Sequence, residues 1–296
     1  MARVAPGRRT VAQWSVEYDR IISARPLTDK TMANRRNSVR HILSQLGDRP
    51  VRSVRPVDIA TTIRTVWDAG YATTARIVLV EARDMFDQAM LAGWIDSNPA
   101  MPVKPLPVRV RRRRLSLSQW RVMHADAVTR RHQRWLPHLL LLAVVTGQRR
   151  ADLCKMRFAD VVDGYLQIEQ QKTGARIALP LELRLDAIGA TLGEVIDGCR
   201  EYAAPGATLL RKPGGRPLGE SALTVAFEDS RNRVIGLWTG PGTPPTLHEC
   251  RSLSERLYRA QGVDTQTLLG HRRQSMTDAY NDDRGLSHGE WKRLVL

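Results

Sequence analysis

The second half of this 296-residue chain contains four separated polar clusters whose side chains suit chemistry on a phosphate ester. They are Thr146-Gly-Gln-Arg149-Arg-Ala-Asp152, Lys172 in Gln-Lys-Thr-Gly, His248-Glu-Cys-Arg251, and Leu268-Leu-Gly-His271, which Tyr280 follows nine residues later. Guanidinium groups bind phosphate oxygens through paired hydrogen bonds, and histidine exchanges protons near neutral pH. A phenol is a poor nucleophile while protonated, but neighbouring cations favour its phenolate. Together these side chains could attack an anionic ester with a tyrosine oxygen.

Each cluster alone also has an ordinary interpretation. A His and an Arg three residues apart are common on the helix surfaces of basic proteins. A histidine after a glycine, such as His271, is more often a cap or a core residue than a catalyst. Tyr280 by itself suits a half-buried packing position, and Lys172-Thr-Gly174 is typical of a hairpin turn. Only the combination of the clusters, in this order, favours a catalytic site.

The elements that would position these clusters form a mainly helical block with a small β-sheet. Ser116 or Ser118 could cap a helix that reaches about Ala127, and Trp135 to Val145 has the pattern of a buried helix. Residues 165–169 and 176–180 read as two short strands with Lys172 at their turn. Helical patterns resume from about residues 190, 221 and 247. We therefore expect a mixed α/β domain over residues 115–296, ending in a C-terminal tail.

The first block reads as four short amphipathic helices. They are expected at about 11–23, 28–46, 57–69 and 73–91, with apolar residues at helical spacing. Gly47, Gly70 and Gly93 follow the second, third and fourth helices, where a left-handed C-cap is expected. Four such helices make a compact bundle, so residues 1–102 are predicted to form a separate helical domain.

The charge of the chain points to a nucleic-acid partner. Lys and Arg total 46 against 30 acidic residues, a net charge of +16, and only six of the cations are lysines, which leaves 40 arginines. Residues 103–114 hold six cations (Lys104, Arg109 and Arg111 to Arg114) and no acid, which reads as an exposed linker. Such a segment is either a solvated tether or a strap along DNA phosphates, and its place between two folded blocks favours the strap.

Other classes of protein are disfavoured by the same composition. No apolar stretch approaches the ~20 residues of a membrane span, and no secretory signal follows the basic N-terminus. The three cysteines, Cys154, Cys199 and Cys250, are far apart and form no CxxC pair, so neither a disulfide scaffold nor a zinc ribbon is expected, and a reducing compartment is the expected setting. No P-loop, HExxH or paired carboxylates for two-metal chemistry are evident, so no cofactor is expected.

The combined clusters resemble the tyrosine site-specific recombinases, the phage integrase family, and within it the lambdoid phage integrases. The resemblance rests on TGQRRADLCKM, QKTG, TLHECRSLSERLY, LLGH and the ending YNDDRG with a later Trp. It implies a core-binding (SAM-like) helical domain followed by a tyrosine-recombinase catalytic domain. Carried over by position, the catalytic set is Arg149, Lys172, His248, Arg251 and His271, with Tyr280 as nucleophile and Asp152 in support. Lambdoid members begin with a small arm-site-binding domain, whereas only about ten residues precede the first expected helix here.

The resemblance also implies partners and an outcome. It predicts integration or excision of a phage or mobile element through a 3′-phosphotyrosyl link, by a homotetramer on double-stranded attachment sites. A host DNA-bending factor and an excisionase are the accessory partners, the bacterial cytoplasm is the setting, and Arg111 to Arg114 are the expected DNA contacts. The apolar residues of the 287–296 tail are expected to pack on a neighbouring protomer.

Two other functions, and another nucleophile, stay open at this point. A DNA-binding repressor or architectural protein with an inactive catalytic domain would lack one or more of the catalytic residue types. All six principal positions hold the expected residue type here. A topoisomerase-like relaxer or a dimer resolvase would use the same chemistry for another outcome. Tyr258 is the rival nucleophile, but it lies seven residues after Arg251, about 10 Å along the same expected helix.

Overall fold

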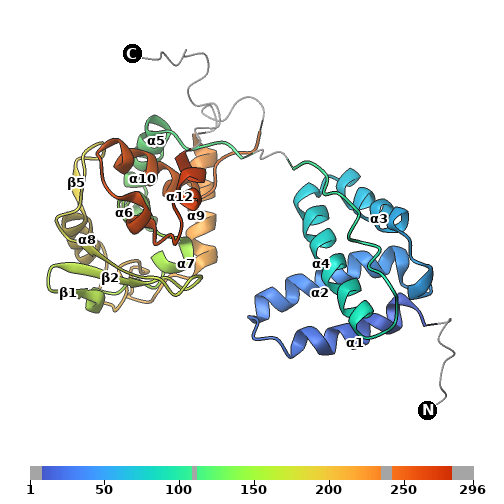
Figure 1. Cartoon of the computed structure of the whole chain (residues 1–296). Helices are drawn as coiled ribbons and strands as arrows, with labels where there is room; N and C mark the ends of the chain where they lie inside the picture. The colour runs from blue at the N-terminus through green and yellow to red at the C-terminus, as the bar shows by residue number, and fades with distance from the viewer. Residues whose placement is uncertain (1–8, 109–111, 235–241, 282–296) are drawn as a thin grey trace, which may run out of the picture. The chain divides into compact units, whose positions relative to one another are not determined.

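The computed structural model describes residues 9–108, 112–234 and 242–281, and the chain divides into two compact units, Met1–Val110 and Arg111–Leu296 (Figure 1). Each unit has its own apolar core. Within the described ranges no helix is both long and apolar enough to cross a bilayer. The 287–296 tail, Arg109 and Arg111 lie outside the described residues.

The first unit is the expected four-helix domain. Its helices are α1 (Val11–Ser23), α2 (Asp29–Leu46), α3 (Pro56–Asp68) and α4 (Ala72–Leu91), with a short 3-10 turn, η2 (Val51–Ser53), before α3. Thr10 caps α1 in a capping box with Gln13, and Pro56 stands at the first position of α3, where its missing N–H costs nothing. The expected left-handed glycines are found at Gly70 and Gly93, but the prediction is wrong for Gly47, whose φ of −53° is right-handed.

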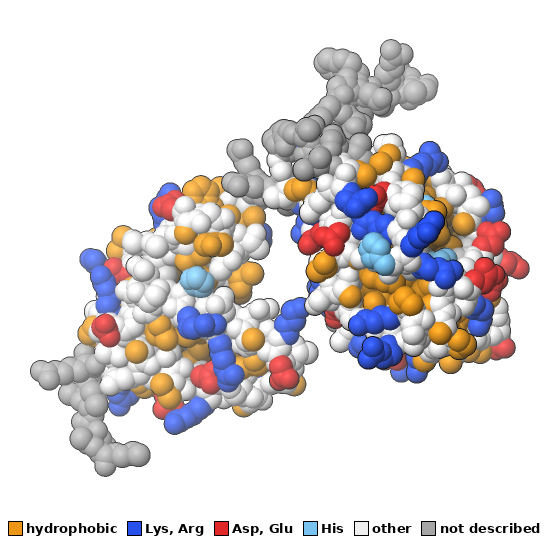
Figure 2. All heavy atoms as spheres, turned by 180° about the vertical axis from the view of Figure 1, so that it is seen from behind, with side chains coloured by type: hydrophobic (Ala, Val, Ile, Leu, Met, Phe, Trp, Pro, Cys, Tyr) orange, Lys and Arg blue, Asp and Glu red, His pale blue; other side chains and the backbone are white. Residues whose placement is uncertain are grey.

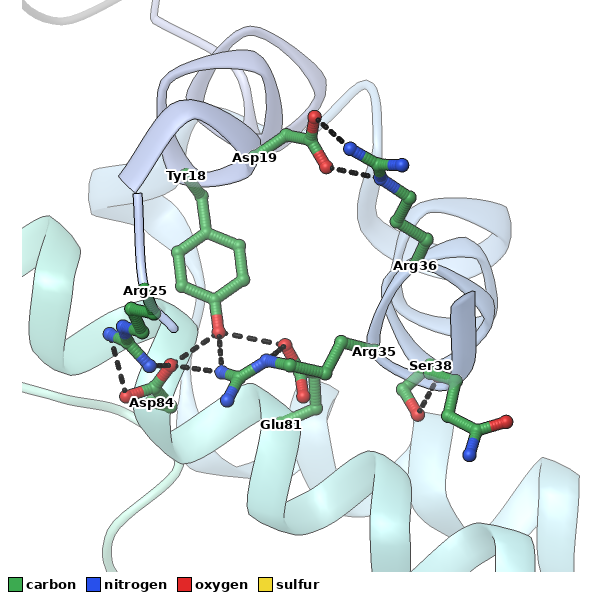
Figure 3. Close-up of polar contacts among 9 residues, drawn as sticks. Tyr18, Asp19, Arg25, Arg35, Arg36, Ser38, Glu81 and Asp84 are labelled. Carbon is green, nitrogen blue, oxygen red and sulfur yellow. Dashed lines mark hydrogen bonds and ion pairs between the residues drawn. The ribbon is translucent and has the colours of Figure 1, made fainter. Parts of the chain in front are cut away.

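A polar network joins α1, α2 and α4 inside the first unit (Figure 3). The Tyr18 hydroxyl lies 2.7 Å from Glu81 Oε1 and 2.5 Å from Asp84 Oδ2, and it accepts a hydrogen bond from Arg35. Arg25, just after α1, donates to Asp84, and Arg35 also pairs with Glu81. Burial, with the hydrogen bonds to the two carboxylates, raises the pKa of Tyr18 above its usual range. The network thus holds three helices together with matched charges.

The second unit is mainly helical with a small sheet, as expected. Its helices are α5 (Leu117–Val128), α6 (Leu136–Thr146), α7 (Arg150–Leu153), α8 (Leu192–Glu201), α9 (Glu220–Arg233), α10 (Glu249–Ala260), α11 (Thr265–Leu269) and α12 (Gln274–Asn281), with 3-10 turns η3 (Arg131–Gln133) and η4 (Phe158–Asp160). The strands are β1 (Val161–Val162), β2 (Tyr165–Glu169), β3 (Arg176–Pro180), β4 (Arg184–Leu185) and β5 (Ala190–Thr191). Ser116 caps α5, which settles the choice between the two serines.

The apolar helix α6 is the centre of the second unit. Most of its residues are fully buried, and α5, α8, α9 and α10 pack against it. The antiparallel sheet β1-β2-β3 forms one edge of the unit, with Gln167 paired to Ala178 in the middle of the β2–β3 hairpin. Gly147 ends α6 with a φ of +63°, so the chain turns sharply from the buried helix into the Gln148-Arg149 segment. This turn begins the candidate site.

The expected basic linker is divided between the two units. Val103 is buried in the first unit, and the Trp67 indole donates to the carbonyl of Pro107. On the other side, Arg113 N donates to the carbonyl of Thr243 in the second unit. The described parts of residues 103–114 are therefore packed on their own units, which differs from a fully solvated tether.

Candidate active site

Arg251 is the most deeply buried cation of the candidate site. It lies in the first turn of α10, is 1% exposed, and donates to the carbonyls of Gly147 (2.7 Å) and Leu269 (2.6 Å). Its Nε is buried and has no partner among the described residues. Burial, together with the nearby charge of Arg149, lowers the pKa of Arg251 to about 10. Two guanidiniums close together, held by neutral acceptors, make a site that favours an anion.

His271 is held in one protonation state by its neighbours. Its Nε2 lies 3.0 Å from Arg251 Nη2, and its Nδ1 lies 2.9 Å from the Thr277 hydroxyl. Because a guanidinium only donates, Nε2 must accept, which leaves the proton of a neutral ring on Nδ1. Burial lowers the pKa of His271 to about 4, with Arg251 and Arg149 contributing. The folded protein therefore keeps this histidine neutral at ordinary pH.

Tyr280 lies beside both histidines. It is half-buried on α12, its hydroxyl is 3.2 Å from His248 Nε2, and its ring stacks on that of His271 with centroids 5.5 Å apart. The Arg251 guanidinium lies 5.7 Å from the Tyr280 ring centre. Reduced hydration and the charge of Arg251 lower the pKa of His248, although the residue itself is exposed. A neutral His248 is able to accept the tyrosine proton.

Tyr258, the rival nucleophile, is not accessible. It is 0% exposed, and its hydroxyl donates to the carbonyl of Val145 at 3.0 Å. Burial raises the pKa of Tyr258 well above its usual range. The residue anchors α10 to α6 from inside the core, so it cannot reach a substrate without unfolding.

Arg149 joins this group through an amide. It precedes α7, and its Nη1 donates to the Gln170 side-chain oxygen at 2.7 Å. Gln170 ends the β2 side of the hairpin and also contacts Gln148 and the carbonyl of Leu269. The structure thus brings together five of the six principal residues, namely Arg149, His248, Arg251, His271 and Tyr280.

Lys172 and Asp152 lie at the neighbouring hairpin turn. Lys172 is exposed between β2 and β3, and no contact of its ammonium with the other five is found in the described structure. Asp152 is 4% exposed, and its Oδ1 accepts from the backbone N–H of Gln171 at 2.9 Å. The Asp152 carboxylate thus fixes the base of the loop that carries Lys172, which fits its expected supporting place at the site.

Arg114 differs from the expected exposed strap. It is 3% exposed, its Nη1 lies 3.0 Å from Glu249 Oε2, and its Nη2 donates to the carbonyl of Ala279 at 2.7 Å. Arg114 is therefore not exposed, as a strap along DNA would require, because a buried carboxylate and a carbonyl bind its guanidinium. Arg112, with 41% side-chain exposure, lies 3.6 Å from the same Glu249.

Sequence reasoning missed the residues that hold the site together. Gln170, Thr277 and Arg114 contact Arg149, His271 and the Tyr280 segment respectively. Gln170 is adjacent to the Gln-Lys-Thr-Gly motif, and Arg114 ends the basic run, so each was near a signal. Nothing in the sequence indicated that their side chains turn inward. In the space-filling view, Lys and Arg side chains surround a histidine on one face of the second unit (Figure 2).

Comparison with known proteins agrees with this arrangement. Residues 114–285 match the phage integrase family model, and residues 16–105 match the phage integrase central domain. The integrase of Enterobacteria phage P21 is 39% identical over 94% of this chain and 77% of its own length. That of Escherichia phage lambda is 36% identical over 97% of this chain and 79% of its own.

Solved structures give the same result. A lambda integrase (75–356) dimer bound to a COC′ core site aligns with a TM-score of 0.89 and 34% identity over 97% of this chain and 100% of that one. A lambda integrase tetramer bound to a Holliday junction aligns with the same TM-score and identity, over 97% of this chain and 81% of that one. A helical domain followed by this catalytic domain defines a tyrosine recombinase, an enzyme of site-specific DNA recombination. The chain belongs to the phage integrase family.

Proposed function

We propose that this chain cuts and rejoins DNA at specific attachment sites with Tyr280 as its nucleophile. The observation that carries the proposal is the position of the Tyr280 hydroxyl, 3.2 Å from His248 Nε2, beside the buried guanidinium of Arg251. A phenol, a proton acceptor and a cation then stand together at one place. The Tyr258 phenol is instead buried, and its hydroxyl donates to the carbonyl of Val145.

The two arginines bind the scissile phosphate. Attack on a phosphodiester places extra negative charge on the non-bridging oxygens, and guanidiniums can fork onto these oxygens while remaining charged. Arg251 keeps a buried Nε without a partner in the described structure, and the charge of Arg149 lowers its pKa. Among the described residues, no carboxylate forms an ion pair with either guanidinium. A phosphate between the two groups would relieve the repulsion between them. Losing one such electrostatic partner typically slows a reaction about a hundred- to thousandfold.

Proton transfer completes the cleavage step. The Tyr280 oxygen bonds to phosphorus, its proton passes to His248, and the bond between phosphorus and the 5′-oxygen breaks. Lys172, on its exposed turn, supplies the proton to the leaving 5′-oxygen. The product is a 3′-phosphotyrosyl link and a free 5′-hydroxyl, and attack by a 5′-hydroxyl on that link reverses the reaction. The protein side chains thus supply both proton transfers, without a nucleotide.

The partners follow from the relatives. Because lambda integrase has been solved on a core site as a dimer and on a Holliday junction as a tetramer, we propose that this chain also acts on double-stranded DNA as a tetramer. Arg111 to Arg113 stay the proposed phosphate contacts of the basic strap. The bacterial cytoplasm is the proposed place of action, with a DNA-bending factor and an excisionase as accessory partners.

The test is covalent trapping on a nicked suicide site. The wild-type chain should accumulate a DNA-linked species, and the linked peptide should contain Tyr280. Tyr280→Phe should bind the site with unchanged affinity and give no covalent product, whereas the matched change Tyr258→Phe should still give the product when folded. Linkage at any other tyrosine would contradict the proposal. A plasmid with paired sites, compared with one without sites, separates recombination from simple relaxation.

A further inference from the structure

Gln170 occupies the centre of a hydrogen-bond network that the catalytic residues surround. The residue is 0% exposed. Its Oε1 accepts from Arg149 Nη1 at 2.7 Å and from the Thr173 hydroxyl at 2.8 Å. Its Nε2 donates to Gln148 Oε1 at 2.8 Å and to the carbonyl of Leu269 at 2.9 Å. Two donors and two acceptors are the full capacity of a side-chain amide, so the group is completely satisfied.

The four partners lead to different parts of the site. Arg149 is contacted directly. Thr173 is next to Lys172 on the hairpin, so the amide also fixes the loop that carries this lysine. The Leu269 carbonyl accepts both from Gln170 and from Arg251 Nη2, and His271 follows two residues later. One buried side chain is therefore within one or two contacts of two arginines, a lysine and a histidine.

The surroundings are built to fit this amide. Gly270 has a φ of +61°, and a Cβ added there would lie 2.9 Å from Gln170 Nε2. Glycine is thus needed at this position both for the backbone conformation and for the close approach of the amide. The main chain of Gln170 is fixed as well, because its carbonyl accepts from Gly174 and its N–H donates to Ala175. The side chain has little freedom to move away from Arg149.

The chemistry of an amide also suits the task. A carboxylate in this position would pair with Arg149 and neutralise the charge that the phosphate needs. The amide oxygen is neutral, so it orients the guanidinium and leaves its full positive charge in the site. Among the described residues no carboxylate forms an ion pair with Arg149, so the charge of its guanidinium is not neutralised by the groups that orient it.

We propose that Gln170 is a positioning residue for the cleavage step, which holds Arg149 in the orientation that binds the scissile phosphate. This inference rests on the proposed function of the site. Gln170 touches neither substrate nor reacting atoms; it acts through Arg149. A displacement of a catalytic group by about 1 Å can cost on the order of a hundredfold in rate. Loss of the amide should therefore slow cleavage ten- to a hundredfold without weakening the binding of the site.

The experiment compares Gln170→Met with Gln171→Met in single-turnover cleavage of a nicked site. Methionine has nearly the length of glutamine but no hydrogen bonds, and Gln171 is the exposed neighbour. Gln170→Met should cleave ten- to a hundredfold more slowly than wild type, and Gln171→Met should cleave normally.

Two modified substrates show through which group Gln170 acts. A methylphosphonate at the scissile position removes the oxygen charge that Arg149 must bind, so the wild-type and Gln170→Met rates should become similar. A bridging sulfur in place of the 5′-oxygen leaves as a thiolate without needing a proton, so it bypasses the proton donor and should leave the Gln170→Met defect unchanged. Partial unfolding would lower the rates on all substrates equally and so cannot imitate this pattern.

The outcomes separate the two proposals. If wild type forms no covalent product, the proposed function fails. If wild type cleaves and Gln170→Met matches Gln171→Met, the role of Gln170 is refuted while the proposed function stands. Rescue of Gln170→Met by the bridging sulfur, without rescue by the methylphosphonate, would overturn the action through Arg149 and assign the amide to Lys172.

Discussion

The buried ion pair between Arg114 and Glu249 gives a prediction that is independent of cleavage. The two side chains are 2% and 1% exposed, and their charged atoms are 3.0 Å apart. Replacing Arg114 with Met leaves the Glu249 carboxylate buried, with Arg112 as a neighbour at 3.6 Å. Breaking a buried pair by removing one partner costs about 3–5 kcal/mol of stability. The lower value applies here because Arg112 stays close to the Glu249 carboxylate. We therefore expect Arg114→Met to lower the free energy of unfolding by about 3 kcal/mol.

Calorimetry of the full chain can measure this change. For a unit of this size, about 1 kcal/mol corresponds to roughly 2–4 °C, so the transition of the second unit should fall by roughly 6–12 °C. The exposed Arg121, which also donates to a carbonyl, provides the matched control, and Arg121→Met should shift the transition by less than about 2 °C. Glu249→Gln added to Arg114→Met should restore part of the loss, because it removes a buried carboxylate charge that has lost the Arg114 guanidinium. Equal melting of Arg114→Met and Arg121→Met would refute the reasoning.

Three further predictions concern the site. Lys172→Ala should bind its DNA site normally but cleave very slowly, and a bridging 5′-sulfur should restore cleavage; absence of rescue would count against Lys172 as the proton donor. The pKa of His271 falls from 6.5 to about 4 on folding, so between these pH values the unfolded chain binds one more proton than the folded chain at this residue. The stability of the protein should therefore decline as the pH drops from 6.5 to 4. His271→Gln should show a flatter decline of melting temperature over this range, and an unchanged slope would contradict the assignment. Arg112→Gln with Arg113→Gln should weaken binding to all DNA sequences and reduce the salt slope by at most about two; a loss confined to the cognate site would indicate base reading instead.

The sequence predicted those parts of the fold whose signals are local. The strands at 165–169 and 176–180 were expected at the bounds that the structure has, because alternating residues and a Lys-Thr-Gly turn define a hairpin. The N-caps of α1 and α5, Thr10 and Ser116, are also set by nearby residues, although only the Ser116 cap was expected. The short helices α7, α11 and α12 were not predicted, because helices of four to eight residues have too few turns to show a period.

The site was predicted by residue type and not by contact. The six principal residues were found through their order along the chain, and five of them do lie together. The sequence could not show that Arg114 is buried, since in a run of four arginines every member looks the same. Which one turns inward depends on Glu249, 135 residues away. For the same reason Gln170 gave no signal, because its amide becomes important only when Gln148, Arg149 and Leu269, which are distant in the sequence, surround it.

The arginines of this chain differ in the groups that bind their guanidiniums. This difference separates the arginines that stabilise the fold from those that can bind a substrate. Arg114 and Arg130 are paired with carboxylates, so their charge is already neutralised. Arg211 is 1% exposed and pairs with no described carboxylate, yet its three guanidinium nitrogens donate to the carbonyls around the end of α8, including those of Cys199 and Ala204. A guanidinium saturated in this way stabilises a helix C-terminus and has no donor to offer.

Arg251 is also held by carbonyls, but it differs in two respects. Its Nε has no partner in the described structure, and a second guanidinium, that of Arg149, is close enough to lower its pKa. Burying the Arg251 guanidinium beside a second cation is unfavourable, because desolvation and the repulsion from Arg149 both act against its charged form. An anion that binds both groups reverses the balance. The attraction would be strongest for the most highly charged species on the reaction path, which is the phosphorane-like transition state, so this arrangement favours the chemical step over the binding of the ground state.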